Sequence, residues 1–268
     1  MKKLMVIDGN SIVNRAFYGV SQSLTTREGQ PTNAIFGFLN IMNKLLDEVS
    51  PDALCVTFDR SAPTFRHLAY DQYKANRKGM PDELASQMPL LKEVLSALNI
   101  PMYELDGWEA DDLLGTIARL DEEDGWDTVI VTGDKDSLQL VTEKTTVKLV
   151  STRMGHTTTR DVTPDSFREE YGFDPKNMID LKALMGDSSD NYPGVKGVGE
   201  KTAMALIQLY RTIAHLYDHM PDICSAPNAA AKPGLVKKLA EGRESAFLSY
   251  DLATIRTDAP ITFQPEDS

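Results

Sequence analysis

The chain has 268 residues, 41% hydrophobic and 25% charged, which is long enough for one large or two modest folded domains. Its two cysteines exclude a disulfide framework and a zinc set, and no apolar stretch approaches the ~20 residues that a membrane-spanning helix needs. The net charge of −12 argues at face value against a nucleic-acid partner. The first apolar run stops at Asp8, too early for a signal peptide, so we expect a cytoplasmic protein without a membrane partner.

Short β-rich runs alternate with helix-length segments in the first half of the chain. Three runs typical of buried strands each lead into an aspartate: residues 3–8, 53–59 and 127–134. Three segments have apolar residues at helical spacing: 34–49, 83–98 and 110–123. This alternation predicts an α/β fold, in which a parallel central sheet is flanked by helices on both faces.

The second half of the chain has a different character. A further strand is predicted at 145–150, followed by turns and a short hairpin up to about residue 165. Glycine, proline and short helical patterns then take over, so we expect a smaller helical domain from residue 178. Small residues at 224–234 predict a surface loop, and the polar ending FQPEDS indicates a domain that continues into another one.

Carboxylates are the main candidate functional groups. Ligands of open α/β sheets bind at the carboxyl ends of the parallel strands, which is where Asp8, Asp59 and Asp134 lie. Each acid alone has an ordinary explanation as a turn or helix-capping residue. So many acids at one edge would repel each other unless cations intervene. Nine carboxylates are therefore predicted to face one cleft: Asp8, Asp59, Glu109, Asp111, Asp112, Asp134, Asp136, Asp187 and Asp190.

The chemistry of these ligands indicates the metal. Oxygen donors without histidine or cysteine select Mg²⁺ or Mn²⁺. Two such ions about 4 Å apart form the clamp used in phosphodiester hydrolysis, in which one ion activates water and both stabilise the oxygens of the phosphate. We therefore predict a two-metal site. Without its nine carboxylates the net charge would be only −3, and bound ions would compensate further, so the charge of −12 need not exclude DNA.

A basic stretch follows the second predicted strand. Residues 60–78 contain five lysines or arginines and one acid, and aromatic rings such as Tyr73 suit stacking on bases. A solvated charged loop is the alternative. Because the stretch leaves directly from a proposed metal ligand, we favour an arch at about residues 60–90 that crosses the strand ends. Lys74 and Arg77 would then reach the scissile phosphate as catalytic cations.

A glycine-rich turn follows the last two acids. In PGVKGVGEKTA, three glycines allow close backbone approach, and a helix is predicted from Glu200 to Leu209. Backbone N–H groups at the start of a helix bind phosphate without reading bases. A P-loop is excluded because GxxxxGK[ST] is absent, and a Rossmann motif because no strand directly precedes the glycines. A purely structural turn remains open.

Seven motifs together resemble one known family: VIDGN, TFD, YKANR, EADD, VTGDKDSLQL, GDSSDNYPGVKGVGEKTA and LATIRTD. From residue 4 to 263 the chain is similar to the 5′-nuclease, or flap endonuclease, domain of bacterial DNA polymerase I, which also occurs as stand-alone exonucleases. The resemblance implies a PIN/resolvase-like α/β nuclease domain over residues 1–177 with a helical arch. It also implies a helical DNA-binding domain over residues 178–268, built on a helix-three-turn-helix motif.

The same resemblance implies a role for each candidate residue. Five acids would hold a first metal ion: Asp8, Asp59, Glu109, Asp111 and Asp112. Four would hold a second: Asp134, Asp136, Asp187 and Asp190. Lys74 and Arg77 match arch residues implicated in catalysis. The implied DNA contacts are Arg15, Tyr73, Gly194, Lys196, Gly197, Gly199 and Lys201, and the glycine turn would also hold a K⁺ ion against the duplex backbone.

The resulting hypothesis is a structure-specific 5′-3′ exonuclease or flap endonuclease, a monomer associated with the bacterial nucleoid. Its substrates would be flapped, nicked or 5′-ended duplex DNA and RNA–DNA hybrids, in primer removal and repair, with a polymerase module following in a longer chain. A haloacid-dehalogenase-type phosphatase also begins with a strand-end DG, but Asn10 stands where that class needs a second aspartate. A non-catalytic DNA-junction binding module would bind DNA without cleaving it.

Overall fold

The computed structural model describes residues 1–220 and 234–268, so most of the predicted loop at 224–234 lies outside the described residues. The chain divides into two compact units. Unit 1 consists of Met1–Thr64, Lys78–Thr163 and Arg256–Ser268. Unit 2 consists of Phe65–Arg77 and Pro164–Ile255. Each unit therefore contains segments that are distant in sequence, and the functional division expected at residue 178 stays a prediction.

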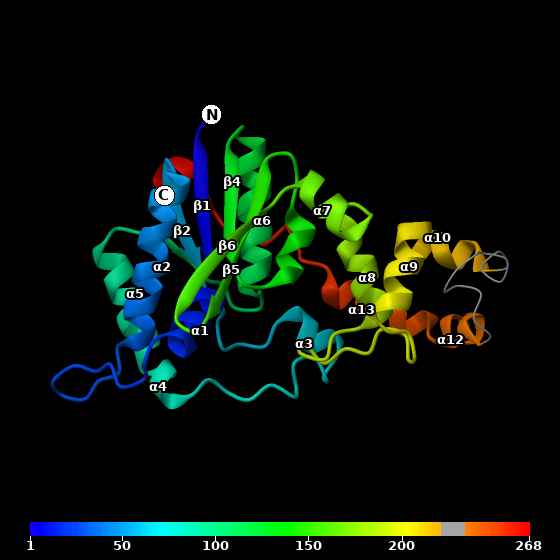
Figure 1. The fold of residues 1–268 in the computed structure, drawn as a ribbon, viewed down its shortest axis with the longest axis horizontal. Coiled ribbons are helices and arrows are strands. Elements are labelled where there is room, and N and C mark those ends of the chain that lie inside the picture. The colour runs from blue at the N-terminus through cyan, green and yellow to red at the C-terminus, as the bar shows by residue number, and fades with distance from the viewer. Residues whose placement is uncertain (221–233) are drawn as a thin grey trace. The chain divides into compact units, whose positions relative to one another are not determined.

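Unit 1 is built on a six-stranded sheet with the order β3-β2-β1-β4-β5-β6 (Figure 1). Its strands are β1 Lys3–Asp8, β2 Ala53–Thr57, β3 Met102–Tyr103, β4 Asp127–Thr132, β5 Thr145–Arg153 and β6 His156–Val162. The first five run parallel to their neighbours, and β6 pairs antiparallel with β5. The predicted parallel sheet is confirmed. The hairpin expected after residue 150 is present, but the predicted strand itself forms one of its arms, because β5 extends to Arg153 and pairs with β6.

The helices of unit 1 follow the expected alternation with two exceptions. They are α1 Gly9–Gly19, α2 Asn33–Val49, α4 Asp82–Ala85, α5 Gln87–Ala97 and α6 Ala110–Glu123, with short 3₁₀ turns η1 Lys135–Leu140 and η4 Pro265–Asp267. Helix α1 was not predicted. The single helix predicted over 83–98 is wrong, because it is divided at Ser86. Pro89 has no N–H to donate to the carbonyl of Ala85, so the helical ladder is interrupted there.

Side-chain alternation along β1 supplies both faces of the core. Met5 and Ile7 belong to an apolar cluster with residues of α1, α2 and α5. Leu4 and Val6 are equally buried and, by the two-residue period of a strand, point to the opposite face. Helix α6 packs against β1, β2 and β4 there, and Figure 1 shows it on the side of the sheet away from α2. Apolar groups on both faces explain why the strand is a continuous hydrophobic run.

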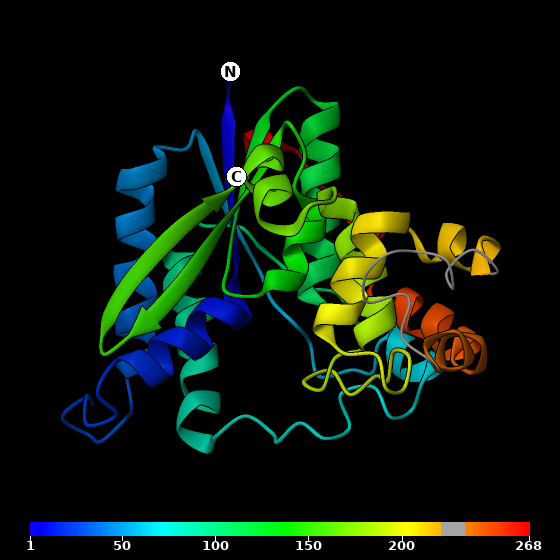
Figure 2. The same cartoon turned by 45° about the vertical axis from the view of Figure 1, so that its right-hand side comes forward.

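Unit 2 is helical, as expected for the second half of the chain. Its helices are α3 Phe65–Ala69, α7 Pro164–Tyr171, α8 Met178–Met185, α9 Glu200–Tyr210, α10 Ile213–Asp218, α12 Leu235–Glu241 and α13 Arg243–Ala253, with a 3₁₀ turn η2 Pro175–Asn177. Helices α8 and α13 pack side by side (Figure 2). Within the described ranges, no helix combines the length and apolarity needed to cross a bilayer.

Helix α3 joins unit 2 through a buried arginine. Arg66 donates from Nε to the carbonyl oxygen of Leu252 at 3.0 Å and from Nη2 to that of Thr254 at 2.6 Å. These carbonyls lie at the end of α13, where helical carbonyl groups lack intrahelical partners. One cation of the basic stretch predicted from sequence, Arg66, is therefore structural.

Candidate metal and nucleic-acid site

The carboxyl end of β1 is the switch point of the sheet, because β1 lies between β2 and β4. Asp8 ends β1 and caps α1, accepting a hydrogen bond from Ser11 N at Oδ1, 3.1 Å away. Its Oδ2 accepts from Thr132 Oγ1 at 2.8 Å, and that hydroxyl oxygen accepts from Asp134 N at 3.1 Å. Thr132 therefore ties the acid that ends β1 to the acid that follows β4.

The charge of Asp8 is poorly accommodated by its surroundings. Asp8 is only 4% exposed, and burial raises its pKa to about 7. Hydrogen bonds from Thr132 and Ser11 lower this pKa, whereas the negative charges of Asp59 and Asp134 raise it. A cation at this edge of the sheet would relieve the repulsion among the three carboxylates.

Asp59 connects the second strand to the start of α6. It lies two residues after β2, and its N–H donates to Asn10 Oδ1 at 2.8 Å. Its own Oδ1 accepts from Ala110 N, the first residue of α6, at 2.7 Å. These two bonds place an exposed carboxylate close to the predicted acids at the head of α6.

The acids at the head of α6 have separate roles. Glu109 and Asp112 form a capping box, in which Asp112 Oδ2 accepts from Glu109 N at 3.1 Å. Asp112 Oδ1 accepts from Arg256 N at 2.8 Å, and the side chain is completely buried. Asp112 thus holds the returning segment 256–268 on α6, while Asp111 beside it remains partly exposed.

Asp134 caps η1, and Asp136 lies in the first turn of that element. Asp134 Oδ1 accepts from Asp136 N at 2.9 Å, and both side chains are partly exposed. Arg15 Nη2 donates to the carbonyl oxygen of Gly133, the residue before Asp134, at 2.7 Å. A Cβ at Gly133 would overlap the guanidinium of Arg15, which explains the glycine in VTGD.

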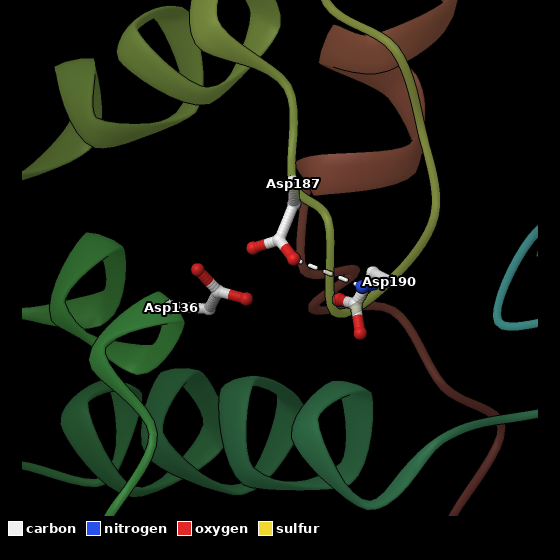
Figure 3. Close-up of side chains that lie close together, drawn as sticks. All are labelled: Asp136, Asp187 and Asp190. Atoms are coloured by element: carbon white, nitrogen blue, oxygen red, sulfur yellow. Dashed lines mark hydrogen bonds between the residues drawn. The ribbon is translucent and has the colours of Figure 1, made fainter. Parts of the chain in front are cut away.

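The last two acids belong to unit 2 and lie in the loop after α8. Figure 3 shows the hydrogen bond from Asp190 N to Asp187 Oδ1, which measures 2.9 Å. Lys182 Nζ lies 2.7 Å from Asp187 Oδ2. Burial raises the pKa of Asp187, but the hydrogen bond and charge of Lys182 and the bond from Asp190 N bring it below its ordinary value. Asp187 is therefore held ionised, which is the state in which a carboxylate can bind a metal ion.

The proposed catalytic cations contact this same loop. Arg77 Nη2 lies 2.5 Å from Asp190 Oδ1. The N–H of Lys74 donates to the carbonyl oxygen of Asp190 at 2.8 Å, and Lys74 Nζ lies 5.1 Å from the ring centre of Tyr73. Lys74 has a φ of +56°, a conformation that few side chains favour, and the backbone bond holds it there.

Tyr73 differs from the expected exposed stacking ring. It is only 4% exposed and packs in an apolar cluster with Tyr192 and Leu252. His67 meets its ring edge-on, with the ring centres 5.2 Å apart. Although Tyr73 stands in a basic segment, its apolar ring is buried in the core of unit 2. In this structure the ring therefore supports Lys74 and does not present a face to bases.

The glycine turn contains one structural and two exposed glycines. Gly194 is buried with φ +59°, and its N–H donates to Ser249 Oγ at 2.9 Å. Its carbonyl accepts from Ser245 Oγ at 2.6 Å. Both polar groups are thus engaged within the fold, and Gly194 shapes the turn. The other expected contacts at the start of α9 are exposed: Lys196, Gly197, Gly199 and Lys201.

Three supporting residues were not identified from the sequence. Asn10 orients Asp59, Thr132 orients Asp8, and Lys182 pairs with Asp187. Lys182 lies four residues before the segment GDSSD, and nothing in the local sequence marks it as a partner of Asp187. Thr132 gives a usable signal, because a hydroxyl residue ending a strand two positions before a proposed ligand lies at the same edge.

Two family models match adjoining parts of the chain. The 5′-3′ exonuclease N-terminal resolvase-like domain matches residues 3–172. The 5′-3′ exonuclease C-terminal SAM fold matches residues 173–268. The observed sheet of unit 1 and the helices of unit 2 agree with this pair of folds.

Curated relatives extend well beyond this chain. The DNA polymerase I of Caldicellulosiruptor bescii is 43% identical over 265 residues, covering 99% of this chain and 30% of the relative. The DNA polymerase I of Bacillus subtilis is 44% identical over 260 residues, covering 97% and 28%. The chain therefore spans about 30% of the length of these relatives.

Solved structures share the fold at low sequence identity. The bacteriophage T5 D15 flap endonuclease, in a pseudo-enzyme-product complex with DNA and metal ions, has a TM-score of 0.75 and 24% identity, with 96% of this chain and 90% of that chain covered. The catalytic core of Rad2 in complex with DNA substrate has a TM-score of 0.61 and 21% identity, with 99% and 84% covered. These likenesses support the architecture of the chain.

Proposed function

Because the chain belongs to the 5′-3′ exonuclease family, we propose that it is a structure-specific 5′ nuclease that hydrolyses phosphodiester bonds in flapped, nicked or 5′-ended duplex DNA. The observation that carries the proposal is the group of acids at the carboxyl edge of the unit 1 sheet, where burial and the negative charges of Asp59 and Asp134 raise the pKa of Asp8. RNA–DNA hybrids are included because RNA and DNA strands share the phosphodiester backbone that these contacts would bind.

The donor set fits hard divalent cations. The proposed ligands are carboxylates without cysteine or histidine, which favours Mg²⁺ or Mn²⁺. Burial is the main cause of the raised pKa of Asp8, and the negative charges of Asp59 and Asp134 raise it further, so divalent ions would stabilise its ionised form. We propose two ions. The first would use Asp8, Asp59, Glu109, Asp111 and Asp112, and the second Asp134, Asp136, Asp187 and Asp190.

The residues of the chain then position the substrate. Bound divalent ions would supply an activated water and neutralise the phosphate oxygens during an in-line displacement. Thr132 and Ser11 hold Asp8 in place, and Asn10 holds Asp59. Lys74 and Arg77 would contact the scissile phosphate and offset its developing charge.

Duplex binding is assigned to the glycine turn and to Arg15. Lys196 lies before α9 and Lys201 lies in its first turn, and both are exposed. The N–H groups of that turn would point at a bound phosphate. Gly197 and Gly199 allow the backbone of the duplex to approach closely. We include a K⁺ ion at this turn, between its carbonyl oxygens and the DNA backbone.

The relatives support a proposal for the biological setting. A polymerase module would follow in a longer chain, as in the DNA polymerases I that this chain resembles. The activity would then serve primer removal and repair at the nucleoid of a bacterial cytoplasm, with the chain acting as a monomer. Structural neighbours bound to DNA support a DNA substrate.

The test uses a 5′-labelled flap duplex, with wild-type chain and the Asp134→Asn variant, in Mg²⁺ and in EDTA. We expect cleavage near the flap junction only with Mg²⁺ and only in the wild type. Full cleavage by Asp134→Asn would contradict the ligand set. Binding of the flap duplex without cleavage in Mg²⁺ would instead support the non-catalytic junction-binding alternative.

A further inference from the structure

Two basic side chains neutralise the carboxylates in the loop after α8. Lys182 pairs with Asp187 at 2.7 Å, and Arg77 pairs with Asp190 at 2.5 Å. Lys182 and Asp187 are five residues apart, so their pair lies within one helix and its following loop. Arg77 and Asp190 are 113 residues apart, so their pair joins two segments of unit 2.

The pairs also differ in their exposure to solvent. The side chains of Lys182 and Asp187 are 19% and 12% exposed, whereas the side chain of Arg77 is 48% exposed. Water competes well for an exposed guanidinium, so the Arg77 pair is the weaker of the two. It is therefore the pair that an incoming cation can exchange.

The segment that carries Arg77 has other contacts with the loop. Lys74 N donates to the carbonyl oxygen of Asp190 at 2.8 Å. Asn76 Nδ2 donates to the carbonyl oxygen of Ser188 at 2.8 Å, and Asn191 Nδ2 donates to that of Gln72 at 2.7 Å. None of these three bonds uses the carboxylate of Asp190. The guanidinium can therefore leave that carboxylate while the segment stays docked.

We propose that Arg77 is the resident counter-cation of Asp190, and that a divalent ion takes its place and frees the guanidinium for a DNA phosphate. The inference rests on the proposed function, in which Asp190 is a metal ligand and Arg77 reaches the substrate. A divalent ion on Asp190 repels the guanidinium beside it, and a phosphate is the nearest alternative anion once DNA is bound. Metal loading thus prepares Arg77 for its catalytic contact.

The first test measures Mn²⁺ binding to the metal-free chain by calorimetry, without DNA. Arg77→Gln and Lys78→Gln each remove one exposed positive charge, but only Arg77 pairs with Asp190. Asp190→Asn should weaken the Mn²⁺-binding event that uses this loop, and that loss identifies the event in the titration. From the typical strength of an exposed ion pair, we expect Arg77→Gln to bind Mn²⁺ about two- to fivefold more tightly than Lys78→Gln. Equal affinities of these two variants would overturn the exchange.

The second test follows the arginine directly by NMR. The Nε–H of Arg77 donates to the carbonyl oxygen of Ser189 at 3.3 Å, so its signal reports the bound guanidinium. Mg²⁺ should shift this signal in the wild type and leave it unchanged in Asp190→Asn. An unshifted signal at saturating Mg²⁺ would contradict the exchange but would leave the proposed metal ligands in place. If Asp190→Asn does not weaken Mn²⁺ binding, the proposed ligand set itself fails.

Discussion

The hydroxyl of Thr132 donates a hydrogen bond to Asp8 at 2.8 Å, which joins the ends of two neighbouring strands at the proposed metal site. Its oxygen also accepts from Asp134 N. One side chain thus fixes the separation of two proposed ligands. The arrangement explains how a buried carboxylate keeps a defined orientation before any ion binds.

Replacing Thr132 by valine should raise the pKa of Asp8 further, because the hydrogen bond that lowers it is lost while burial remains. Protonated Asp8 binds a divalent ion poorly. As the pH is lowered at limiting Mg²⁺, cleavage by the variant should therefore be lost at a higher pH than cleavage by the wild type. Thr132→Ser keeps the hydroxyl and should preserve the pH–rate profile. Superimposable profiles of the valine variant and the wild type would refute the role of Thr132.

Asp111 and Asp112 should respond differently to the same substitution. Both oxygens of Asp112 accept backbone N–H groups, and asparagine offers only one acceptor oxygen. Asp112→Asn should therefore lower the free energy of unfolding of the metal-free chain by about 1–3 kcal/mol. Asp111→Asn should leave it nearly unchanged. Urea unfolding in EDTA measures both, and equal stabilities would contradict the capping role.

Gly133→Ala should act on DNA binding through Arg15. The added methyl group occupies the position of the guanidinium, which is the flexible end of its side chain and can move away. We expect the variant to lose about as much DNA affinity as Arg15→Ala, with a stability change of under ~1 kcal/mol. In the double variant the two losses should not add, because both remove one contact. Additive losses in a fluorescence-anisotropy titration would exclude this coupling.

Asp121 should make the metal-free chain less stable as the pH rises. Burial raises its pKa to about 6, above an ordinary value of 3.8, although a hydrogen bond from Thr128 lowers it. The folded state then binds the proton more tightly than the unfolded state. Its contribution is largest below about pH 4, falls between about pH 4 and 6, and is constant above that.

Asp8 also makes the stability depend on pH, because its pKa is raised to about 7. Comparing the variant Asp121→Asn with the wild type separates the contribution of Asp121 from that of Asp8. The stability difference between variant and wild type should grow by on the order of 1–3 kcal/mol between pH 4 and 7 and then stay constant. Thermal unfolding in EDTA across that range measures it. A difference that does not vary with pH would mean that Asp121 titrates normally.

Much of the fold follows from local sequence patterns. The strand KLMVID and the helix over 110–123 were predicted at their observed bounds, because continuous apolar runs and strong helical periodicity are local signals. Helix α1 was missed because it starts directly after β1, with Asp8 serving both as strand end and as cap. The strand β3 has two residues and is too short for any periodicity.

The supporting contacts of the site could not be predicted in the same way. The pairing of Arg77 with Asp190 and the bond from Arg256 to Asp112 join residues more than 100 positions apart. Tyr73 shows the same limit, because its burial against Leu252 depends on how unit 2 folds. The strand-end acids were accessible to sequence reasoning since topology alone places Asp8 and Asp134 at one edge.

The most direct measurement is the anomalous diffraction of crystals soaked in Mn²⁺, which locates each bound ion. We expect two Mn²⁺ peaks on the proposed carboxylates, one involving Asp8 and the other Asp187, with oxygen ligands at about 2.0–2.2 Å. Loss of the first peak is expected in crystals of Asp8→Asn. An absence of Mn²⁺ from these carboxylates at saturating concentration would contradict the metal-dependent nuclease that is proposed for this chain.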